Sequence, residues 1–251
     1  MSSYEAEKAL KESEVVIIPI GSFEQHGPHL PLKTDHTLTF ERACKIAKKT
    51  ETVVAQILNL GYSHHHLGFP GTISLSNETL ISVLKDTALS LSYSGIKKIL
   101  FLNGHGGNDN ALSMAEKIIE EDIDVSVAVF GVNDITSYSP KEYQNKFDIH
   151  AGVQETAAMY IYDKSSVREN KIKKPELLID FDFKKIAEEF DEKTAKKIFY
   201  KKFKKIKDLS SNGVITTLDP KKAKDFIEIR EEMEALFIES VSNFISAWKK
   251  Y

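Results

Sequence analysis

The feature that most constrains this sequence is an apolar run that passes directly into a polar loop. The run, Val15 to Ile20, is rich in β-branched residues and predicts a buried strand. The loop that follows, GSFEQHGPHLPLKTD at positions 21–35, is dense in acidic residues, histidine, glycine and proline. A loop of this composition is unsuited to a hydrophobic core, whereas its carboxylate and imidazole side chains are suited to binding a metal ion.

The spacing within this loop places ligand types on one side of the chain. Residues two apart in an extended segment point the same way, so Glu24 and His26 can face one site while Gln25 faces away. Tight turns at the intervening glycines and prolines can bring the carboxylate of Asp35 back to the same place. The loop therefore predicts a site with at least three ligand side chains.

A second polar loop follows another apolar run. Residues 99–102 are predicted to form a strand, and the sequence NGHGGN follows at once at positions 103–108. A predicted helix to about residue 121 and a strand at 125–130 come next. This order predicts βαβ units on a mainly parallel sheet, which is an α/β fold. Because ligands bind at the carboxyl ends of such strands, we expect both loops at one rim.

The remaining segments extend the same pattern. Helical periodicity predicts helices at 37–49, 76–93 and 228–249, and a further helix after His150 that carries Glu155. Residues 53–58 predict another short strand. The lysine-rich residues 164–225 are expected to be peripheral surface helices and connectors, forming a lid or an oligomer contact. No repeat or linker interrupts the chain, so residues 1–251 are predicted to form one domain.

Composition excludes several classes of partner. A net charge of -3 gives no reason to expect a nucleic-acid or membrane partner. No apolar run approaches the ~20 residues of a membrane span, and residues 1–8 do not resemble a secretory signal. The single cysteine, Cys44, excludes an internal disulfide and suits a reducing cytoplasm, where we expect the protein to be located.

The candidate ligands form a mixed carboxylate and imidazole set: Glu24, His26, Asp35 and His105, with Glu155 available to complete a second ion. Such a set suits Zn, Mn or Fe(II), and one carboxylate can bridge two divalent ions. Taken singly, each residue has an ordinary alternative as a solvated loop residue or a helix cap. Taken together, at strand ends among glycines, they favour a metal site.

The glycines of the second loop suggest how a substrate would be held. Gly104, Gly106 and Gly107 form an ordinary turn in one interpretation. In the other, they let the backbone approach a ligand closely and offer N–H groups to a developing negative oxygen. His105 in the middle of the loop favours the second interpretation.

Four blocks of sequence together resemble the creatininase (creatinine amidohydrolase) family. They are GSFEQHGPHLPLKTD, FPGT at 69–72, NGHGGN, and HAGVQET at 150–156, in the order typical of the family. The resemblance implies a three-layer α/β sandwich with a mainly parallel sheet and a dinuclear metal centre. It also implies hydrolysis of C–N bonds in small amides and a homo-oligomer.

The resemblance also implies a role for individual residues. Glu24 and His105 would hold one ion and His26 the other, with Asp35 bridging them. His150 would move protons, and Glu155 would be a further acidic ligand. The residues expected to contact the substrate are Ser63, His66, Thr72, Gly104, Gly106 and Gly107. His29 is expected to be structural, and His36, His64 and His65 are interpreted as ordinary surface or loop residues.

Two departures bear on the substrate. Creatininase proper has an acidic ligand where this chain has Gly107, and tryptophans over its substrate where this chain has only Trp248, in the last predicted helix. Creatinine is therefore disfavoured. The glycine-rich version resembles a branch that includes the archaeal formamidopyrimidine-nucleotide deformylases and the peptide-clipping enzyme of mycofactocin maturation.

The expected function is hydrolysis of a small amide or formamide. The favoured reaction is deformylation of a formamidopyrimidine nucleotide in riboflavin and deazaflavin-coenzyme synthesis. Two divalent ions would activate a water, and His150 would protonate the departing nitrogen. The alternatives are a creatinine or peptide amidohydrolase on the same centre, and a non-catalytic metal-binding assembly protein.

Overall fold

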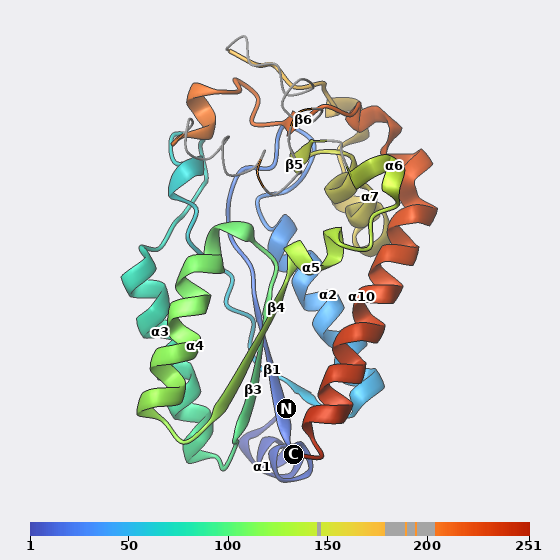
Figure 1. The fold of residues 1–251 in the computed structure, drawn as a ribbon. Helices are drawn as coiled ribbons and strands as arrows, with labels where there is room; N and C mark the ends of the chain where they lie inside the picture. The colour runs from blue at the N-terminus through green and yellow to red at the C-terminus, as the bar shows by residue number, and fades with distance from the viewer. Residues whose placement is uncertain (145–146, 179–188, 190–193, 195–203) are drawn as a thin grey trace.

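A four-stranded parallel sheet forms the centre of the protein (Figure 1). The computed structural model describes residues 1–144, 147–178, 189, 194 and 204–251. The strands lie in the order β2-β1-β3-β4, and each pair of neighbours is parallel. Their bounds are β1 Val15–Ile20, β2 Val53–Val54, β3 Lys98–Asn103 and β4 Ser126–Gly131. The prediction of an α/β fold on a mainly parallel sheet is confirmed.

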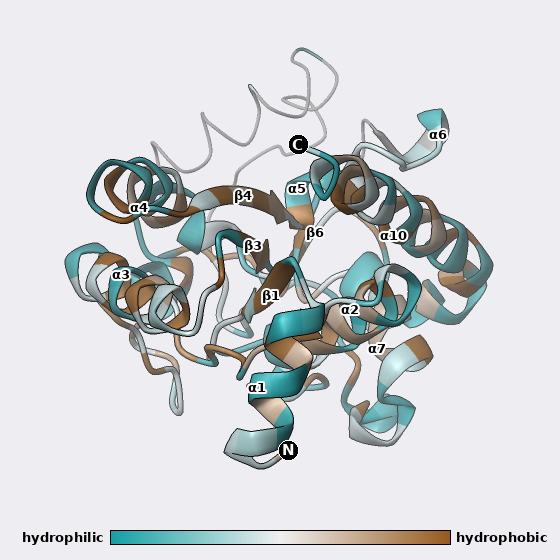
Figure 2. Cartoon of the chain, turned by 90° about the horizontal axis from the view of Figure 1, so that it is seen from below, coloured by the Kyte–Doolittle hydropathy of each residue, from teal (hydrophilic) through white to brown (hydrophobic). Residues whose placement is uncertain are grey.

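Helices cover both faces of this sheet (Figure 2). The β1 side chains alternate between the faces, with Val16 and Ile18 in one apolar cluster and Val15 and Ile17 in the other. One cluster is completed by α3 (Asn77–Tyr93) and α4 (Asp109–Asp122), and the other by α2 (Thr34–Thr50), α7 (Val153–Tyr162) and α10 (Ile227–Trp248). The result is the expected three-layer sandwich.

The register of the sheet brings the two polar loops together. Ile20 at the end of β1 pairs with Asn103 at the end of β3, so the loops after these strands start side by side. A small antiparallel pair, β5 (Asp148–His150) and β6 (Ile215–Thr216), lies beyond this rim and brings His150 over it (Figure 1).

The other elements are short, apart from the ten-residue α1. They are α1 (Ser3–Glu12), α5 (Val132–Thr136), α6 (Lys141–Gln144), and the 3-10 turns η1 (His64–His66), η2 (Gly106–Asn108), η3 (Lys164–Ser166), η4 (Glu169–Lys171), η5 (Ile206–Asp208) and η6 (Pro220–Phe226). No helix among the described residues combines the length and apolar character needed to cross a membrane.

The structure departs from the sequence-based expectations in three places. Helix α2 starts at Thr34, so Asp35 lies in its first turn, where a carboxylate complements the helix dipole. Strand β2 has only two residues. The segment 164–225 is not peripheral throughout, because Leu209, Val214 and Ile215 are fully buried. Much of its middle lies outside the described residues, and the assignment of one domain stays a prediction.

Candidate metal centre

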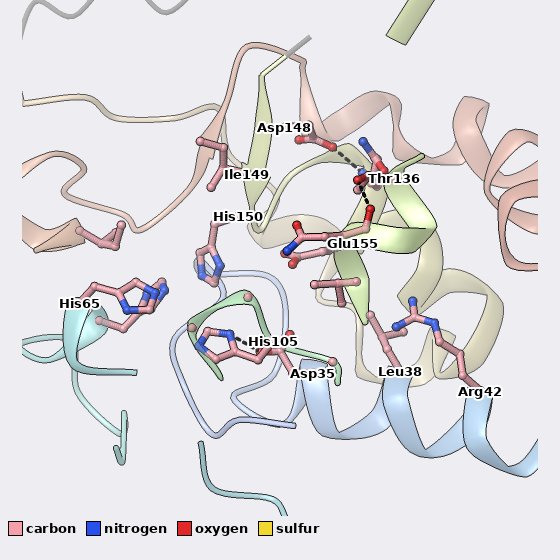
Figure 3. Close-up of a pocket in the computed structure, with 18 of the residues that line it drawn as sticks. Asp35, Leu38, Arg42, His65, His105, Thr136, Asp148, Ile149, His150 and Glu155 are labelled. Atoms are coloured by element: carbon pink, nitrogen blue, oxygen red, sulfur yellow. Dashed lines mark hydrogen bonds and ion pairs between the residues drawn. The ribbon is translucent and has the colours of Figure 1, made fainter. Parts of the chain in front are cut away.

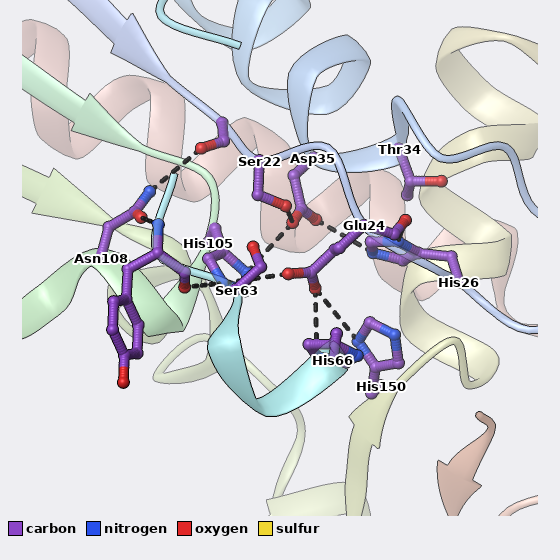
Figure 4. Close-up of polar contacts among 12 residues, drawn as sticks. Ser22, Glu24, His26, Thr34, Asp35, Ser63, His66, His105, Asn108 and His150 are labelled. Atoms are coloured by element: carbon purple, nitrogen blue, oxygen red, sulfur yellow. Dashed lines mark hydrogen bonds and ion pairs between the residues drawn. The ribbon is translucent and has the colours of Figure 1, made fainter. Parts of the chain in front are cut away.

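Four of the predicted ligands converge at the rim of the sheet (Figure 4). Asp35 lies between two imidazoles: His26 Nε2 is 3.1 Å from its Oδ1, and His105 Nδ1 is 3.1 Å from its Oδ2. His105 Nε2 is in turn 3.2 Å from Oε2 of Glu24. All four side chains are buried. We call Glu24, His26, Asp35 and His105 the metal cluster.

Asp35 is held as an anion with one oxygen toward each histidine. Burial by itself would raise the pKa of its carboxyl, but His26 and His105 outweigh burial and hold this pKa well below the usual value. Ser22 donates a hydrogen bond of 2.7 Å to Oδ2 and fixes the carboxylate further. An anion with its two oxygens directed to two separate histidines has the arrangement that a bridging ligand needs.

The carboxylate of Glu24 lacks the partners that a buried anion normally has. The side chain is fully buried, and neither of its oxygens accepts a hydrogen bond within the described part of the chain. Burial, the largest influence, raises the pKa of Glu24. His66 Nε2 and His105 Nε2 each lie 3.2 Å from one of these oxygens, without the geometry of a hydrogen bond. A buried carboxylate that accepts no hydrogen bond is costly, and a bound cation would compensate for it. The residues present therefore fit a cation at this position.

Hydrogen bonds to the backbone orient both imidazoles of the metal cluster. His26 Nδ1 donates to the Glu24 carbonyl at 3.1 Å, and His105 Nε2 donates to the Tyr62 carbonyl at 3.0 Å. The other nitrogen of each ring faces Asp35. Metal-ligating histidines typically donate their outer N–H to such a carbonyl, which fixes the tautomer.

In the metal-free protein these two imidazoles carry positive charge. Burial disfavours the charged form, but Asp35 is the main opposing influence and raises the pKa of His26 to about 10. The pKa of His105 rises to about 9 against burial, mainly through Glu24 and then Asp35. The carboxylates of the site thus favour positive charge at both imidazoles.

His150 and Glu155 border the same site from the side of β5 and α7. His150 Nε2 donates to the Gln25 carbonyl at 2.7 Å, which leaves Nδ1 facing Glu24 Oε1 at 3.8 Å. Glu155 Oε2 accepts the Ala151 N–H at 2.6 Å and lies 3.9 Å from His26 Nε2. Burial lowers the pKa of His150 well below its usual value and raises that of Glu155 to about 7. Between them, Ala151 has a φ of 49°, a strained value for a residue with a Cβ.

Among the described residues, four overlapping triads place their candidate ligand atoms within 4.8 Å of one another. The triads are Glu24–His26–Asp35, Glu24–His65–His105, Glu24–His66–His150 and His26–His150–Glu155. Glu24 belongs to three of them, which agrees with its unpartnered oxygens. The structure thus brings together every residue predicted as a ligand, while the assignment of each to a particular ion stays a prediction.

Sequence reasoning missed His65. Its ring stacks on that of His105 with a centroid distance of 5.6 Å and an interplanar angle of 4°, and burial lowers its pKa to about 3. The sequence does contain a signal for this residue, a run of three histidines in a loop rich in glycine. In the structure the turn η1 directs two of these histidines inward. His29 is buried against Thr156 through a 2.9 Å hydrogen bond, as expected for a structural residue.

A pocket opens beside the metal cluster (Figure 3). Its lining includes Asp35, His65, His66, Gly104, His105, Gly106, Gly107, His150 and Glu155. Two residues predicted to contact substrate do not line it. Thr72 Oγ1 accepts the Gln25 N–H at 3.1 Å and so supports the loop. Ser63 is fully buried beside Glu24 (Figure 4).

The three glycines of the second loop have different roles. A Cβ on Gly104 would lie 1.6 Å from Thr39 Oγ1, and the Gly104 N–H already donates to Ile20, so it is not free for a substrate oxygen. A Cβ on Gly107 would lie 2.3 Å from His105 Nε2, so glycine preserves the orientation of that ring. Only at Gly106 is there open space.

The far side of the pocket carries a second group of buried charges, which we call the arginine cluster. Arg42 donates from Nε and Nη2 to the two oxygens of Glu234 at 2.7 Å each, and Arg230 Nε donates to Oε1 at 2.9 Å. Although burial opposes ionisation, Arg42 and then Arg230 lower the pKa of Glu234 to about 2. Both arginines line the pocket.

Comparison with known proteins establishes the family. A sequence model of the family Creatininase, described as creatinine amidohydrolase, matches residues 1–246. The chain belongs to the creatininase family. The resemblance inferred from the four sequence blocks is confirmed.

Curated relatives within this family differ in activity. The chain is 36% identical over 107 residues to the 3-dehydro-scyllo-inosose hydrolase of Thermotoga maritima (42% of this chain, 34% of the relative). It is 35% identical over 152 residues to the mycofactocin precursor peptide peptidase of Mycolicibacterium smegmatis (58% and 56%). It is 27% identical over 183 residues to the 2-amino-5-formylamino-6-ribosylaminopyrimidin-4(3H)-one 5'-monophosphate deformylase of Methanothermus fervidus (71% and 64%). The chain thus spans between 34% and 64% of these relatives.

Solved creatininase structures share the whole fold. The structure described as creatininase Mn superposes with a TM-score of 0.74 and 20% identity, covering 98% of this chain and 95% of the other. A Zn-Zn type creatininase mutant gives a TM-score of 0.71 at 19% identity, with the same coverage. At these identities the likeness establishes the creatininase-like fold that the sequence predicted.

Proposed function

We propose that the protein is a metal-dependent hydrolase that cleaves a C–N bond in a small amide or formamide. The observation that carries this proposal is the fully buried carboxylate of Glu24, which lacks hydrogen bonds beside two histidines oriented through backbone carbonyls. Membership of a family described as creatinine amidohydrolase supports the reaction class.

The donor set fits two divalent ions. Glu24 and His105 would hold one, His26 and Glu155 the other, and Asp35 would bridge them through its two oxygens. Carboxylate and imidazole ligands suit Zn, Mn and Fe(II). Such ions, when bound, polarise a carbonyl and lower the pKa of a water to near neutrality.

His150 is positioned to carry the proton. Its Nε2–H is committed to the Gln25 carbonyl, so Nδ1 is the basic atom and faces the site. Its depressed pKa keeps the ring neutral, with the lone pair on Nδ1. The same atom can then return the proton to the departing nitrogen, as a general acid does.

For the substrate, we favour the formylamino group of a ribosylaminopyrimidine monophosphate, the substrate after which the Methanothermus relative is named. Arg42 and Arg230 line the pocket, but both are paired with Glu234, so the choice is supported by the relative and not by a free positive charge at the pocket wall. Lys33, near the end of the first polar loop, is half exposed and paired with Asp163 at 3.1 Å.

Formate release tests the proposal. The purified protein is reconstituted anaerobically with Fe(II), Zn or Mn in turn and offered the formylaminopyrimidine nucleotide, a C-terminal peptide amide and creatinine. We expect formate from the nucleotide with at least one metal and none after chelation. Cleavage of the peptide instead would favour the peptidase relative, to which the identity is higher. Inactivity toward all three, with two ions bound, would support the assembly-protein alternative.

The remaining expectations concern the cell and the assembly. A homo-oligomer and a cytoplasmic location are predictions from the family resemblance and the composition. Sedimentation of the metal-loaded protein tests the first, and fractionation of the source cells tests the second.

A further inference from the structure

His66 lies at the edge of the metal cluster and lines the pocket. Its Nε2 is 3.2 Å from Glu24 Oε1, and it shares a possible ligand triad with Glu24 and His150. Two roles are compatible with this position. A metal ligand needs a lone pair on Nε2, whereas a donor to a substrate oxygen needs a hydrogen there.

The neighbouring side chain of Gln25 decides between these roles. Its Oε1 accepts the Gly27 N–H at 2.9 Å, and its Nε2 donates to the Gly213 carbonyl at 3.2 Å. Rotating the amide by 180° would set oxygen against the Gly213 carbonyl and nitrogen against the Gly27 N–H. The orientation of the amide is therefore fixed by two backbone groups.

The fixed amide determines where the hydrogen of His66 lies. Gln25 Nε2 is 2.9 Å from His66 Nδ1, and since the amide nitrogen has only hydrogens to offer, Nδ1 must accept. The neutral ring then carries its hydrogen on Nε2. Because Glu24 Oε1 accepts no hydrogen bond, this N–H is not used by its nearest carboxylate.

The backbone around Gln25 is built for this contact. Gly213 has a φ of 75°, and a Cβ there would lie 1.9 Å from Gln25 Oε1. Gly27 also has a left-handed φ, of 64°. Two glycines, 186 positions apart in the numbering (213 minus 27), thus let the chain close on one buried amide.

We propose that His66 binds substrate and does not ligate metal: its Nε2–H donates to the carbonyl oxygen of the scissile amide. Gln25 is the positioning residue that keeps the hydrogen on Nε2. The proposal rests on the proposed function, because it needs a carbonyl group in the pocket beside Glu24. A neutral imidazole donor at a developing oxyanion stabilises it without adding a charge to be solvated.

The tautomer is tested in the metal-free protein, where no turnover is needed. Nitrogen-15 spectra of protein labelled at histidine are expected to show His66 with its hydrogen on Nε2, and the substitution Gln25→Glu is expected to move it to Nδ1. His29, which does not contact Gln25, is the internal control and keeps its spectrum. A hydrogen on Nδ1 of His66 in the wild type would overturn the proposal.

The role is tested with His66→Leu and His66→Gln, since a glutamine amide can place an N–H near the position of Nε2. Both variants should bind metal at the wild-type stoichiometry. Activity is measured with whichever of the three test substrates the wild type cleaves. The kcat/KM of His66→Leu should be about 10²-fold below that of the wild type, and the kcat/KM of His66→Gln should be at least about tenfold above that of His66→Leu. Loss of metal from both variants would identify His66 as a ligand and overturn the proposal, leaving the hydrolase assignment intact. A wild type that cleaves nothing would refute the function while the tautomer result still stood.

Discussion

The metal cluster and the arginine cluster are both buried groups of charges, yet they differ in how they are satisfied. In the arginine cluster, Glu234 accepts three hydrogen bonds from Arg42 and Arg230 and a fourth from Tyr162 at 3.2 Å. In the metal cluster, neither oxygen of Glu24 accepts a hydrogen bond from the residues that the structure describes. The first cluster is complete as folded, whereas the second has a buried carboxylate available to bind a cation.

This difference teaches how to separate structural from functional charge. Burial and perturbed pKa values occur in both clusters and do not distinguish them. The two clusters differ instead in the number of carboxylate oxygens that accept no hydrogen bond among the described residues. A self-satisfied ion pair ties α2 to α10, while an unsatisfied carboxylate marks the place of a ligand.

The largest expected effect is that of Asp35→Ala. Removing the carboxylate between the two histidines should abolish binding of both ions and lower kcat/KM by at least about 10³-fold, since metal polarisation contributes several kcal/mol. Metal analysis and turnover check this. The matched control is Glu234→Gln, which should keep the full metal content. If Asp35→Ala still bound two metal ions, Asp35 would not be the ligand that bridges them.

His150→Ala separates proton transfer from metal binding. We expect unchanged metal content and a loss of about 10²- to 10⁴-fold in kcat, the range of a general acid or base. Single-turnover kinetics on the metal-loaded variant make the measurement. A variant with full turnover would remove His150 from the mechanism.

Glu234→Gln breaks the complete cluster. It leaves two buried guanidinium groups without their counter-ion, and should lower the free energy of unfolding by about 3–5 kcal/mol. Urea unfolding of the metal-free protein measures this. A change below about 1 kcal/mol would show that the arginine cluster contributes little to stability.

The same residue makes stability depend on pH. The pKa of Glu234 is about 2 in the folded protein against an ordinary value of 4.5, so its contribution to stability is present above pH 4.5 and is lost as pH falls toward 2. Urea midpoints of metal-free wild type should decline over this window more steeply than those of Glu234→Gln. If the urea midpoints of the two proteins declined in parallel, Glu234 would not be the source of this pH dependence.

The smallest effect is expected from Glu24→Gln. In the metal-free protein the substitution removes a buried carboxylate that accepts no hydrogen bond, but it also removes the counter-charge of His105, so these opposing effects should leave stability within about 1 kcal/mol of the wild type. Added metal should stabilise the wild type and have less effect on the variant. Thermal unfolding with and without metal gives the comparison, and a destabilised metal-free variant would show that Glu24 is satisfied as folded.

Local patterns were sufficient to predict the sheet and most of the metal cluster. Glu24 and His26 lie in one loop, Asp35 lies in the helical turn that ends this loop, and His105 follows a recognisable strand, so periodicity and strand order were enough to place them on one rim. The start of α2 was predicted three residues late, because no side chain caps it.

Contacts between distant segments could not be predicted in this way. Arg42 and Glu234 are 192 positions apart, and Gln25 and Gly213 are 188 apart. Neither pair has a local signature, because the partner of each residue is selected by tertiary packing. For the same reason Gln25 was predicted only to face away from the ligands, and its hydrogen bond to His66 was missed.

The contact of Gly213 with Gln25 has a consequence for how the site matures during synthesis. Every candidate ligand, from Glu24 to Glu155, has been made by the time residue 155 leaves the ribosome, but the carbonyl that holds the Gln25 amide comes 58 residues later (213 minus 155). A nascent or truncated chain that ends before Gly213 would carry the complete ligand set with a histidine free to move its hydrogen between its two nitrogens. The orientation of the His66 ring thus depends on a segment that is made after every candidate metal ligand.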